Sequence, residues 1–167
     1  MANPMYGQNK ADNQIDNTNG EVKFFTPASD GTAVADAESI VLKSSDAGNY
    51  YFLNIADNTC SVKLPSASES KGAIFTFIMD IQSDNESAKD FILFTNAATE
   101  YIMGACFDGA GVHDQPSDDD FIQLDSSDGA VGAGDRIQVI SNGHHWFILE
   151  GSALTANAWN SGTATRS

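Results

Sequence analysis

The residues best suited to chemistry are the acidic run Asp118-Asp119-Asp120 and the nearby Asp114. Carboxylate oxygens are the hard ligands that calcium takes. The spacing does not match an EF-hand loop, which needs alternating acidic or amide residues, a central glycine and a terminal glutamate. Calcium binding and a solvated acidic loop are both compatible with this segment, and we expect the solvated loop.

Histidine and cysteine supply the other candidates. His144 and His145 are adjacent, and neighbouring residues of a strand point to opposite faces, so the two imidazoles do not readily chelate one metal. His113 follows Cys106 closely enough to suggest a thiol–imidazole nucleophile pair, but no motif supplies an orienting third group or an oxyanion hole. The chain also lacks the G-x-S-x-G, P-loop and H-E-x-x-H motifs. We expect no enzyme activity, no catalytic residue, no cofactor and no metal.

The clearest local structure is a predicted β-hairpin in Gly134–Gly151. Runs of β-branched and aromatic residues, Arg136–Ile140 and His145–Leu149, flank Asn142-Gly143, the preferred central pair of a two-residue type I′ turn. That turn predicts one face that is wholly apolar and one that is mixed. The predicted pairs of the apolar face are Val139 with Trp146 and Ile137 with Ile148.

The mixed face of the hairpin is too apolar for free solvent and too polar for a sealed interior, and it suits either a second packed layer or a subunit contact. Its predicted pairs are Ile140 with His145, Gln138 with Phe147 and Arg136 with Leu149.

The rest of the chain consists of short apolar runs bounded by turn residues, with no convincing helical period. In Ala73–Asp80 both alternating faces are apolar, which predicts a central strand between layers. About ten strands at this spacing predict an all-β fold: an antiparallel β-sandwich, jelly-roll-like, with an extended N-terminal arm. The other predicted strands are Glu21–Phe25, Ser39–Lys43, Tyr50–Ile55, Cys60–Leu64, Phe91–Thr95, Tyr101–Met103 and Phe121–Leu124. The predicted loops are Gln82–Asp90, Ala105–Asp120 and Asp125–Asp135.

We divide the chain into an arm at residues 1–20, a β-sandwich domain at residues 21–154 and a C-terminal tail at residues 155–167. The arm is rich in Asn and Gln, and either is a disordered tail or becomes ordered against a partner through Met5, Tyr6 and Ile15. Trp159 in the tail either folds back on its own subunit or docks on a neighbour.

The chain is strongly acidic: 8 Lys and Arg stand against 23 Asp and Glu, a net charge of −15. Such a field repels phosphate backbones and anionic membranes, so neither nucleic acid nor a membrane is an expected partner. A solubility requirement and an ordinary acidic surface explain the charge equally well. The two cysteines lack CxxC spacing, which predicts buried free thiols. The chain shows no signal-peptide pattern and no apolar run long enough to span a membrane, so we expect neither secretion by that route nor a membrane span.

Four segments in this order carry a resemblance: SVKLP at Ser61–Pro65, KGAIFTFIM at Lys71–Met79, DFIQL at Asp120–Leu124 and GDRIQVISNGHHWFI at Gly134–Ile148. Together they resemble bacteriophage virion proteins, in which a terminal hairpin closes a β-sandwich. The opening MANPMYGQNKADN is similar to the amino-terminal arms of structural proteins from marine tailed phages. Because the chain has a single domain and no shaft, it resembles a capsid decoration (cement) protein in particular.

The resemblance implies a virion protein on the outer capsid surface that binds the major capsid protein and stabilises the assembled shell. It implies a homotrimer, with the arm contacting capsid subunits through Met5, Tyr6 and Ile15. For that trimer we assign the subunit interface to Ile140, Phe147 and Leu149 on the mixed face of the hairpin. The alternative is a tail-fibre or receptor-binding module for host glycans, in which Gln82–Asp90 and Ala105–Asp120 form the site and Trp159 or Tyr101 stacks on sugar. A non-viral carbohydrate-binding module would share the fold and leave the arm unexplained.

Overall fold

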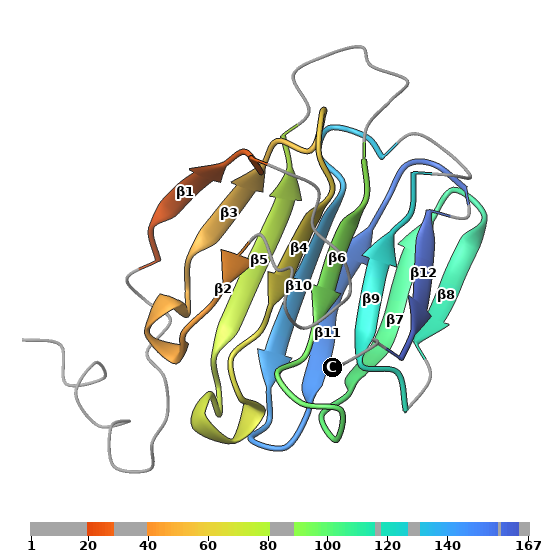
Figure 1. Ribbon diagram of the computed structural model, residues 1–167. Coiled ribbons are helices and arrows are strands. Elements are labelled where there is room, and N and C mark those ends of the chain that lie inside the picture. Colours follow the sequence, from red (N-terminus) through yellow and green to blue (C-terminus); the bar gives the residue numbers. More distant parts are fainter. Residues whose placement is uncertain are drawn as a thin grey trace, which may run out of the picture.

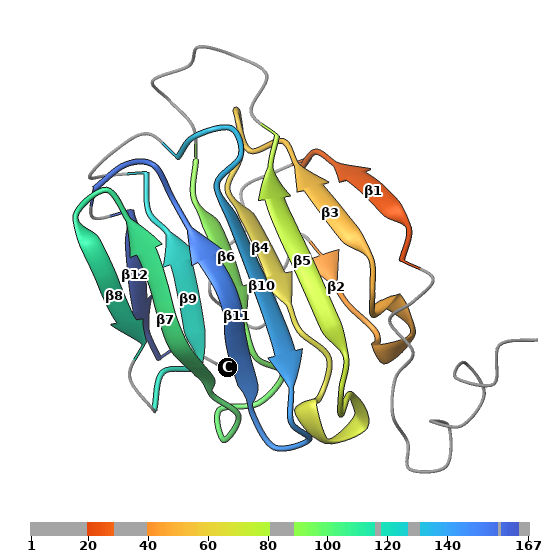
Figure 2. The same ribbon diagram turned by 180° about the vertical axis from the view of Figure 1, so that it is seen from behind.

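The computed structural model describes residues 20–28, 40–80, 89–115, 118–126, 131–156 and 158–163. They form two β-sheets packed face to face (Figures 1 and 2). The strands are β1 (Val22–Phe25), β2 (Ile40–Val41), β3 (Tyr50–Leu53), β4 (Cys60–Lys63), β5 (Ile74–Met79), β6 (Phe91–Phe94), β7 (Ile102–Asp108), β8 (Gly111–Gln115), β9 (Phe121–Leu124), β10 (Arg136–Ser141), β11 (Trp146–Ser152) and β12 (Trp159–Gly162). Two short 3-10 helices, Ser44–Asp46 and Ala67–Glu69, lie in connections. The predicted all-β, sandwich-like fold is confirmed.

The sheets are mixed rather than purely antiparallel, which corrects the predicted topology. The seven-stranded sheet has the order β1-β3-β5-β10-β11-β7-β8 and the five-stranded sheet β12-β9-β6-β4-β2. Strands β1 to β6 alternate between the two sheets, so that β1, β3 and β5 run parallel in one while β2, β4 and β6 run parallel in the other. A chain that crosses to the opposite layer after each strand returns to the first layer in its original direction. Successive strands of one layer therefore run in the same direction and pair as parallel neighbours.

The core lies between the sheets and is aromatic. Phe75 packs on Trp146, with ring centroids 5.7 Å apart, and Phe77 packs on Phe91 across the two sheets at 5.4 Å. These four side chains have no exposed surface. The alternation of Phe75 and Phe77 with outward residues is what a half-buried strand requires. β5 is central in its sheet, as predicted, but its outward residues Ile74 and Ile78 are only half-buried. The strand buried on both faces is β6.

The hairpin β10–β11 forms at the predicted place with a longer loop. Ser141 pairs with Trp146, so residues 142–145 form a four-residue loop instead of a two-residue turn. The Asn142 side chain explains the difference, because its Oδ1 accepts hydrogen bonds from the backbone N–H groups of both His144 and His145 at 2.8 Å. The pairs differ from those predicted: the partners of Val139 and Ile140 are displaced by two residues, and those of Arg136–Gln138 by three because the register shifts between Gln138 and Val139. Val139 and Trp146 nevertheless point into the core as expected.

Two predicted boundaries change. The predicted loop Ala105–Asp120 contains the end of β7 and all of β8, which pair as an antiparallel ladder. The predicted tail contains β12, which pairs with β9 at the edge of the five-stranded sheet. Both are short edge strands without a long apolar run, and therefore they lack the sequence signal that marks a central strand. The predicted loop Gln82–Asp90 and the arm lie largely outside the described residues.

Candidate functional site

The most distinctive surface is the outer face of the seven-stranded sheet. The register places a continuous set of outward side chains on this face across all seven strands. Most of them are apolar, whereas a sheet face exposed to water normally carries polar residues. They are Val22 and Phe24 on β1, Tyr50 and Phe52 on β3, Ile74, Thr76 and Ile78 on β5, Arg136, Gln138 and Ile140 on β10, Phe147, Leu149, Glu150 and Ser152 on β11, Met103, Ala105 and Phe107 on β7, and Val112 and Asp114 on β8.

Several exposed apolar side chains lie at the two edges of this face, and Leu149 on β11 between them is 52% exposed. We call Val22, Phe24, Tyr50 and Phe52 the β1 margin, and Phe107 and Val112 the β8 margin. The side chain of Phe24 is 73% exposed, although its ring stacks on Phe52 at 5.3 Å. Phe107 and Val112 face each other across the β7–β8 ladder and are each 59% exposed. Each margin thus presents a formed apolar ridge to solvent.

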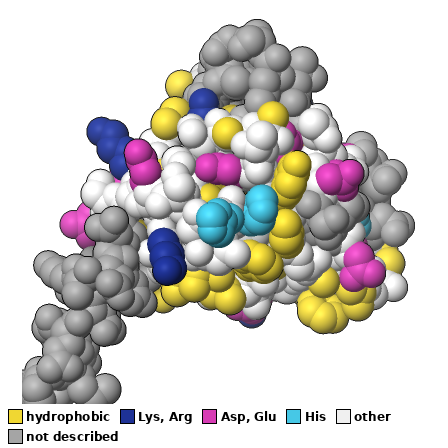
Figure 3. Space-filling model, turned by 90° about the horizontal axis from the view of Figure 1, so that it is seen from below, with side chains coloured by type: hydrophobic (Ala, Val, Ile, Leu, Met, Phe, Trp, Pro, Cys, Tyr) yellow, Lys and Arg dark blue, Asp and Glu magenta, His cyan; other side chains and the backbone are white. Residues whose placement is uncertain are grey.

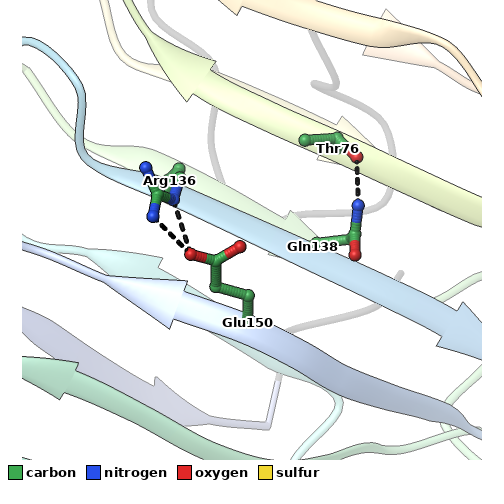
Figure 4. Close-up of polar contacts among 4 residues, drawn as sticks. All are labelled: Thr76, Arg136, Gln138 and Glu150. Atoms are coloured by element: carbon green, nitrogen blue, oxygen red, sulfur yellow. Dashed lines mark hydrogen bonds and ion pairs between the residues drawn. The ribbon is translucent and has the colours of Figure 1, made fainter.

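Polar contacts occupy the middle of the face (Figure 4). The Gln138 side-chain amide donates to Thr76 Oγ1 at 2.8 Å, linking β10 to β5. On the other side of β10 the guanidinium of Arg136 donates through Nε and Nη2 to Glu150 Oε1. The Arg136 and Glu150 side chains are 50% and 49% exposed, so this ion pair contributes little stability. These contacts place polar groups among the apolar outward side chains of the middle strands.

The outer face is nearly free of charge in a chain whose net charge is −15. Its outward residues include three charged side chains, Arg136, Glu150 and Asp114. Two of these neutralise each other, which leaves a net charge of −1. Depletion of charge at the centre of a patch is a compositional mark of protein–protein interfaces. This face is therefore the part of the described surface best suited to contact another protein.

The residues assigned to a subunit interface lie on this same face. Ile140 pairs with Phe147, and Phe147 pairs with Met103 on β7. With Ile74 they form a half-buried apolar row at one end of the sheet. Leu149 is 52% exposed and lies where the β10–β11 register shifts. The residues assigned to capsid contact, Met5, Tyr6 and Ile15, are outside the described residues.

The two margins were not predicted from the sequence. In Val22-Lys23-Phe24-Phe25 the alternation of Lys23 with apolar neighbours does mark a strand with two unlike faces. It does not indicate which of those faces the fold leaves uncovered. Phe107 and Val112 lay in a segment predicted as loop, where no face was assigned.

The acidic run serves the fold through its backbone. The Asp119 carbonyl accepts from Ile102 N at 3.0 Å, the Asp120 carbonyl accepts from Thr95 N at 2.9 Å, and Asp120 N donates to Gly162 O at 3.0 Å. Asp118 is exposed, Asp120 is buried and Asp114 lies on the separate strand β8. Across the described residues no three His, Cys, Asp or Glu side chains are grouped so that they could hold a metal ion.

Cys106 and His113 are paired directly across the β7–β8 ladder, so the structure brings these two candidates together. Cys106 is fully buried, and burial, with a smaller contribution from the Asp108 carboxylate, raises the pKa of its thiol to about 12. Burial likewise raises the pKa of the Cys60 thiol to about 12. Because the thiolate is the nucleophile, this pair is arranged for packing rather than for catalysis.

The histidine pair lies in the β10–β11 loop, at the end of the molecule seen in Figure 3, where histidines adjoin hydrophobic side chains. His145 Nδ1 accepts from Tyr101 N at 3.3 Å, and its ring stacks on Tyr101 at 5.1 Å. His144 is exposed. The two imidazoles therefore have different environments and do not converge.

Trp159 folds back on its own domain. Its indole is 4% exposed, and Nε1 donates to the Phe107 carbonyl at 3.0 Å. A buried indole cannot stack on a bound sugar. Of the two stacking residues considered for glycan binding, Tyr101 alone has a partly exposed ring.

The fold and this surface define a class: a two-sheet all-β domain with an exposed, charge-poor face suited to association. Comparison with known proteins adds no closer assignment, since no family profile, curated protein or solved structure matches the chain. Among the described residues, no helix is long and apolar enough to cross a membrane.

Proposed function

We propose that this protein is a virion structural protein that binds the outer surface of an assembled phage capsid and stabilises it. The observation that carries the proposal is the apolar, charge-poor outer face of the seven-stranded sheet on a chain of net charge −15. A face of this kind is an interaction surface by the usual criteria. The resemblance of the hairpin and arm sequences to phage virion proteins supplies the partner, the major capsid protein.

The proposed mechanism is thermodynamic. A protein that binds the assembled shell but not dissociated subunits stabilises the shell by mass action. Three copies held together raise the effective concentration of each weak contact. In this proposal the arm reaches neighbouring capsid subunits through Met5, Tyr6 and Ile15, while the outer face, including Ile140, Phe147 and Leu149, joins the copies.

Co-sedimentation with purified shells of the source phage tests the proposal. We expect the protein to pellet with assembled shells, to remain in solution with dissociated subunits, and to raise the temperature at which shells release their genome. Binding to both forms alike, or to neither, contradicts it.

The contribution of the arm has its own test. Deleting residues 1–19 keeps Gly20 against Gly48 and keeps the hydrogen bond from Glu21 N to Asn49 Oδ1, so the first strand stays anchored. We expect the deletion, and the triple change of Met5, Tyr6 and Ile15 to Ser, to lower shell occupancy. The matched control changes Asn3, Asn9 and Asn13 to Ser. Full occupancy of the triple variant would remove the arm from the mechanism.

One observation favours the glycan-binding alternative. Tyr101 and His145 form a stacked, partly exposed ring pair at one end of the molecule, and such rings bind sugar faces. A glycan array distinguishes the two functions. Reproducible binding that Tyr101→Ala abolishes, together with no shell occupancy, would replace capsid decoration by host recognition.

A further inference from the structure

The loop between β10 and β11 holds two neighbouring residues that can react with each other. The backbone nitrogen of Gly143 directly follows Asn142, and its attack on Asn142 Cγ closes a five-membered ring without any partner molecule. Glycine obstructs this attack least, because it has no Cβ and adopts backbone angles closed to other residues. The Asn142 side chain is exposed, so solvent reaches this end of the loop. The chain has one other Asn-Gly pair, Asn19-Gly20.

The reaction is deamidation, and it consumes only water. A bond forms between Gly143 N and Asn142 Cγ, the proton of Gly143 N is removed, and the side-chain nitrogen of Asn142 leaves as ammonia. Water then hydrolyses the ring, with no oxidation or reduction. Breaking the bond from Cγ to the ring nitrogen leaves Asp at position 142. Breaking the bond from the backbone carbonyl carbon to that nitrogen leaves isoaspartate, whose main chain runs through Cγ.

The folded loop restrains the attacking nitrogen. Gly143 N donates to Ser141 Oγ at 3.0 Å, and this bond must be lost because the ring has no N–H at position 143. Ser141 is 2% exposed, and its hydroxyl donates in turn to the Ala67 carbonyl at 2.9 Å. The proton that has to leave is therefore directed at a buried hydroxyl rather than at a base in solution.

The same loop restrains the carbon that is attacked. Asn142 Oδ1 accepts from His144 N and His145 N, both at 2.8 Å, and Asn142 N donates to the His145 carbonyl at 3.1 Å. These three bonds fix the side chain relative to the loop backbone. The carboxamide is therefore not free to turn toward an incoming nitrogen.

We propose that Asn142 is a self-modification site that the folded loop holds inactive, with Ser141 as the residue that restrains the attacking nitrogen. The reaction then proceeds only when the loop opens locally. The Asp product keeps an Oδ1 acceptor for the two N–H groups. Isoaspartate carries its carboxylate directly on Cα and has a longer main chain, so the loop cannot close as before and the opening is recorded irreversibly. This inference does not rest on the proposed function.

Rates of deamidation in native and unfolded protein test the restraint. The full chain is incubated in mildly alkaline buffer with and without guanidinium chloride, and peptide mass spectrometry with chromatographic separation of Asp and isoaspartate follows Asn142 and Asn19. In denaturant the two Asn-Gly pairs should react at similar rates, which fixes the intrinsic rate of the pair. In native protein Asn142 should react at least roughly tenfold more slowly, since reaction waits for local opening. A native rate equal to the rate in denaturant overturns the proposal, and so does a faster one, which would mean that the two N–H groups act as an oxyanion hole.

Ser141→Ala tests the role assigned to the hydroxyl. Removing the acceptor of Gly143 N should raise the native rate at Asn142 by roughly fivefold, the equivalent of one typical hydrogen bond, and leave the rate in denaturant unchanged. Ser70→Ala is the matched control, because Ser70 is also buried and its hydroxyl is bonded to Ser44 Oγ at 2.8 Å, outside the loop. A native rate that stays at the wild-type value in Ser141→Ala, or that rises as much in Ser70→Ala, removes Ser141 from the mechanism. If Ser141→Ala does not fold, the comparison of native and denatured wild-type protein still decides the proposal.

Discussion

Gly151 shows how tightly single residues are specified in the core. A Cβ added at this position would collide with Cys106 Sγ, since the two residues share the inner face of neighbouring strands β11 and β7. Cys106 is fully buried among the side chains of the core. The small size of Gly151 is therefore a packing requirement of the β7–β11 pair.

Gly151→Ala should lower the free energy of unfolding by about 1–3 kcal/mol, the usual cost of overpacking a core. Chemical denaturation measures the loss. Adding Cys106→Ala removes the colliding sulfur and should restore part of the stability. A double variant whose losses simply add would show that Gly151 and Cys106 are not coupled.

Both cysteine thiols should be inert in the folded protein. Burial raises the pKa of Cys60 and of Cys106 to about 12, so almost no thiolate exists near neutral pH. A thiol-specific chromogenic reagent at pH 8 should detect no reactive thiol in native protein and both thiols in denaturant. Rapid modification of the native protein would contradict this assignment.

Asp135 makes stability depend on pH in a defined direction. Its buried carboxylate accepts from Gly132 N at 2.7 Å and Leu154 N at 3.0 Å, yet desolvation outweighs these bonds and raises its pKa. As pH rises, Asp135 therefore ionises in the unfolded chain before it ionises in the folded one. Its contribution to the free energy of unfolding is fully present below the pKa of the unfolded chain and is lost as pH rises through the higher pKa of the folded state. The stability of Asp135→Asn relative to wild type should therefore increase from about pH 4 to pH 7. Denaturation at several pH values checks the trend, and an opposite slope would mean that the hydrogen bonds dominate.

At the scale of the element, the β10–β11 hairpin separates what the sequence predicts from what it does not. The Asn-Gly pair correctly locates the reversal, and Gly143 has a φ of 95°, which glycine adopts without strain. The loop length was wrong because Asn142 uses its side chain to close a wider loop. Turn propensity records the backbone preference of a residue, not the hydrogen bonds that its side chain finds.

Asn142→Ala should destabilise the protein by about 1–2 kcal/mol, because the N–H groups of His144 and His145 lose their shared acceptor. Asn142→Asp keeps that acceptor and is the control. Thermal denaturation compares the two. Equal losses in both variants would assign the effect to the loop backbone instead.

The order of strands could not be predicted. Apolar runs show that β1 to β6 are strands, but an alternating run does not indicate which sheet receives it or whether its neighbour is parallel. β8 and β12 were missed because edge strands need few apolar residues, and β8 begins at Gly111, a residue unfavourable in strands.

For the molecule as a whole, charge sets the response to salt. With a net charge of −15, repulsion opposes the compact state, and added salt screens it. The thermal midpoint should therefore rise when sodium chloride is raised from about 0.01 M to 0.3 M, which shortens the Debye length from about 30 Å to well under 10 Å. Differential scanning calorimetry measures the shift, and an uncharged osmolyte at equal osmolality is the control. A midpoint that falls or stays constant would show that charge repulsion does not limit stability.

The candidate surface was only partly predictable at this scale. Ile140 and Phe147 could be placed on an outer face because the hairpin register depends on local sequence alone. The β1 and β8 margins belong to strands at opposite edges of one sheet, and no local pattern shows that Phe24 and Phe107 share a face.

The alternation of β1 to β6 between layers also constrains the order in which the chain folds. No two consecutive strands in this half pair with each other, and β5 finds its second neighbour in β10, a strand more than fifty residues later in the chain. The β10–β11 and β7–β8 hairpins need only local loop closure and form quickly, whereas distant pairings are slow. During synthesis β5 can therefore gain β3 as a neighbour early, but its other edge stays without a partner until the carboxyl-terminal hairpin that contains β10 emerges.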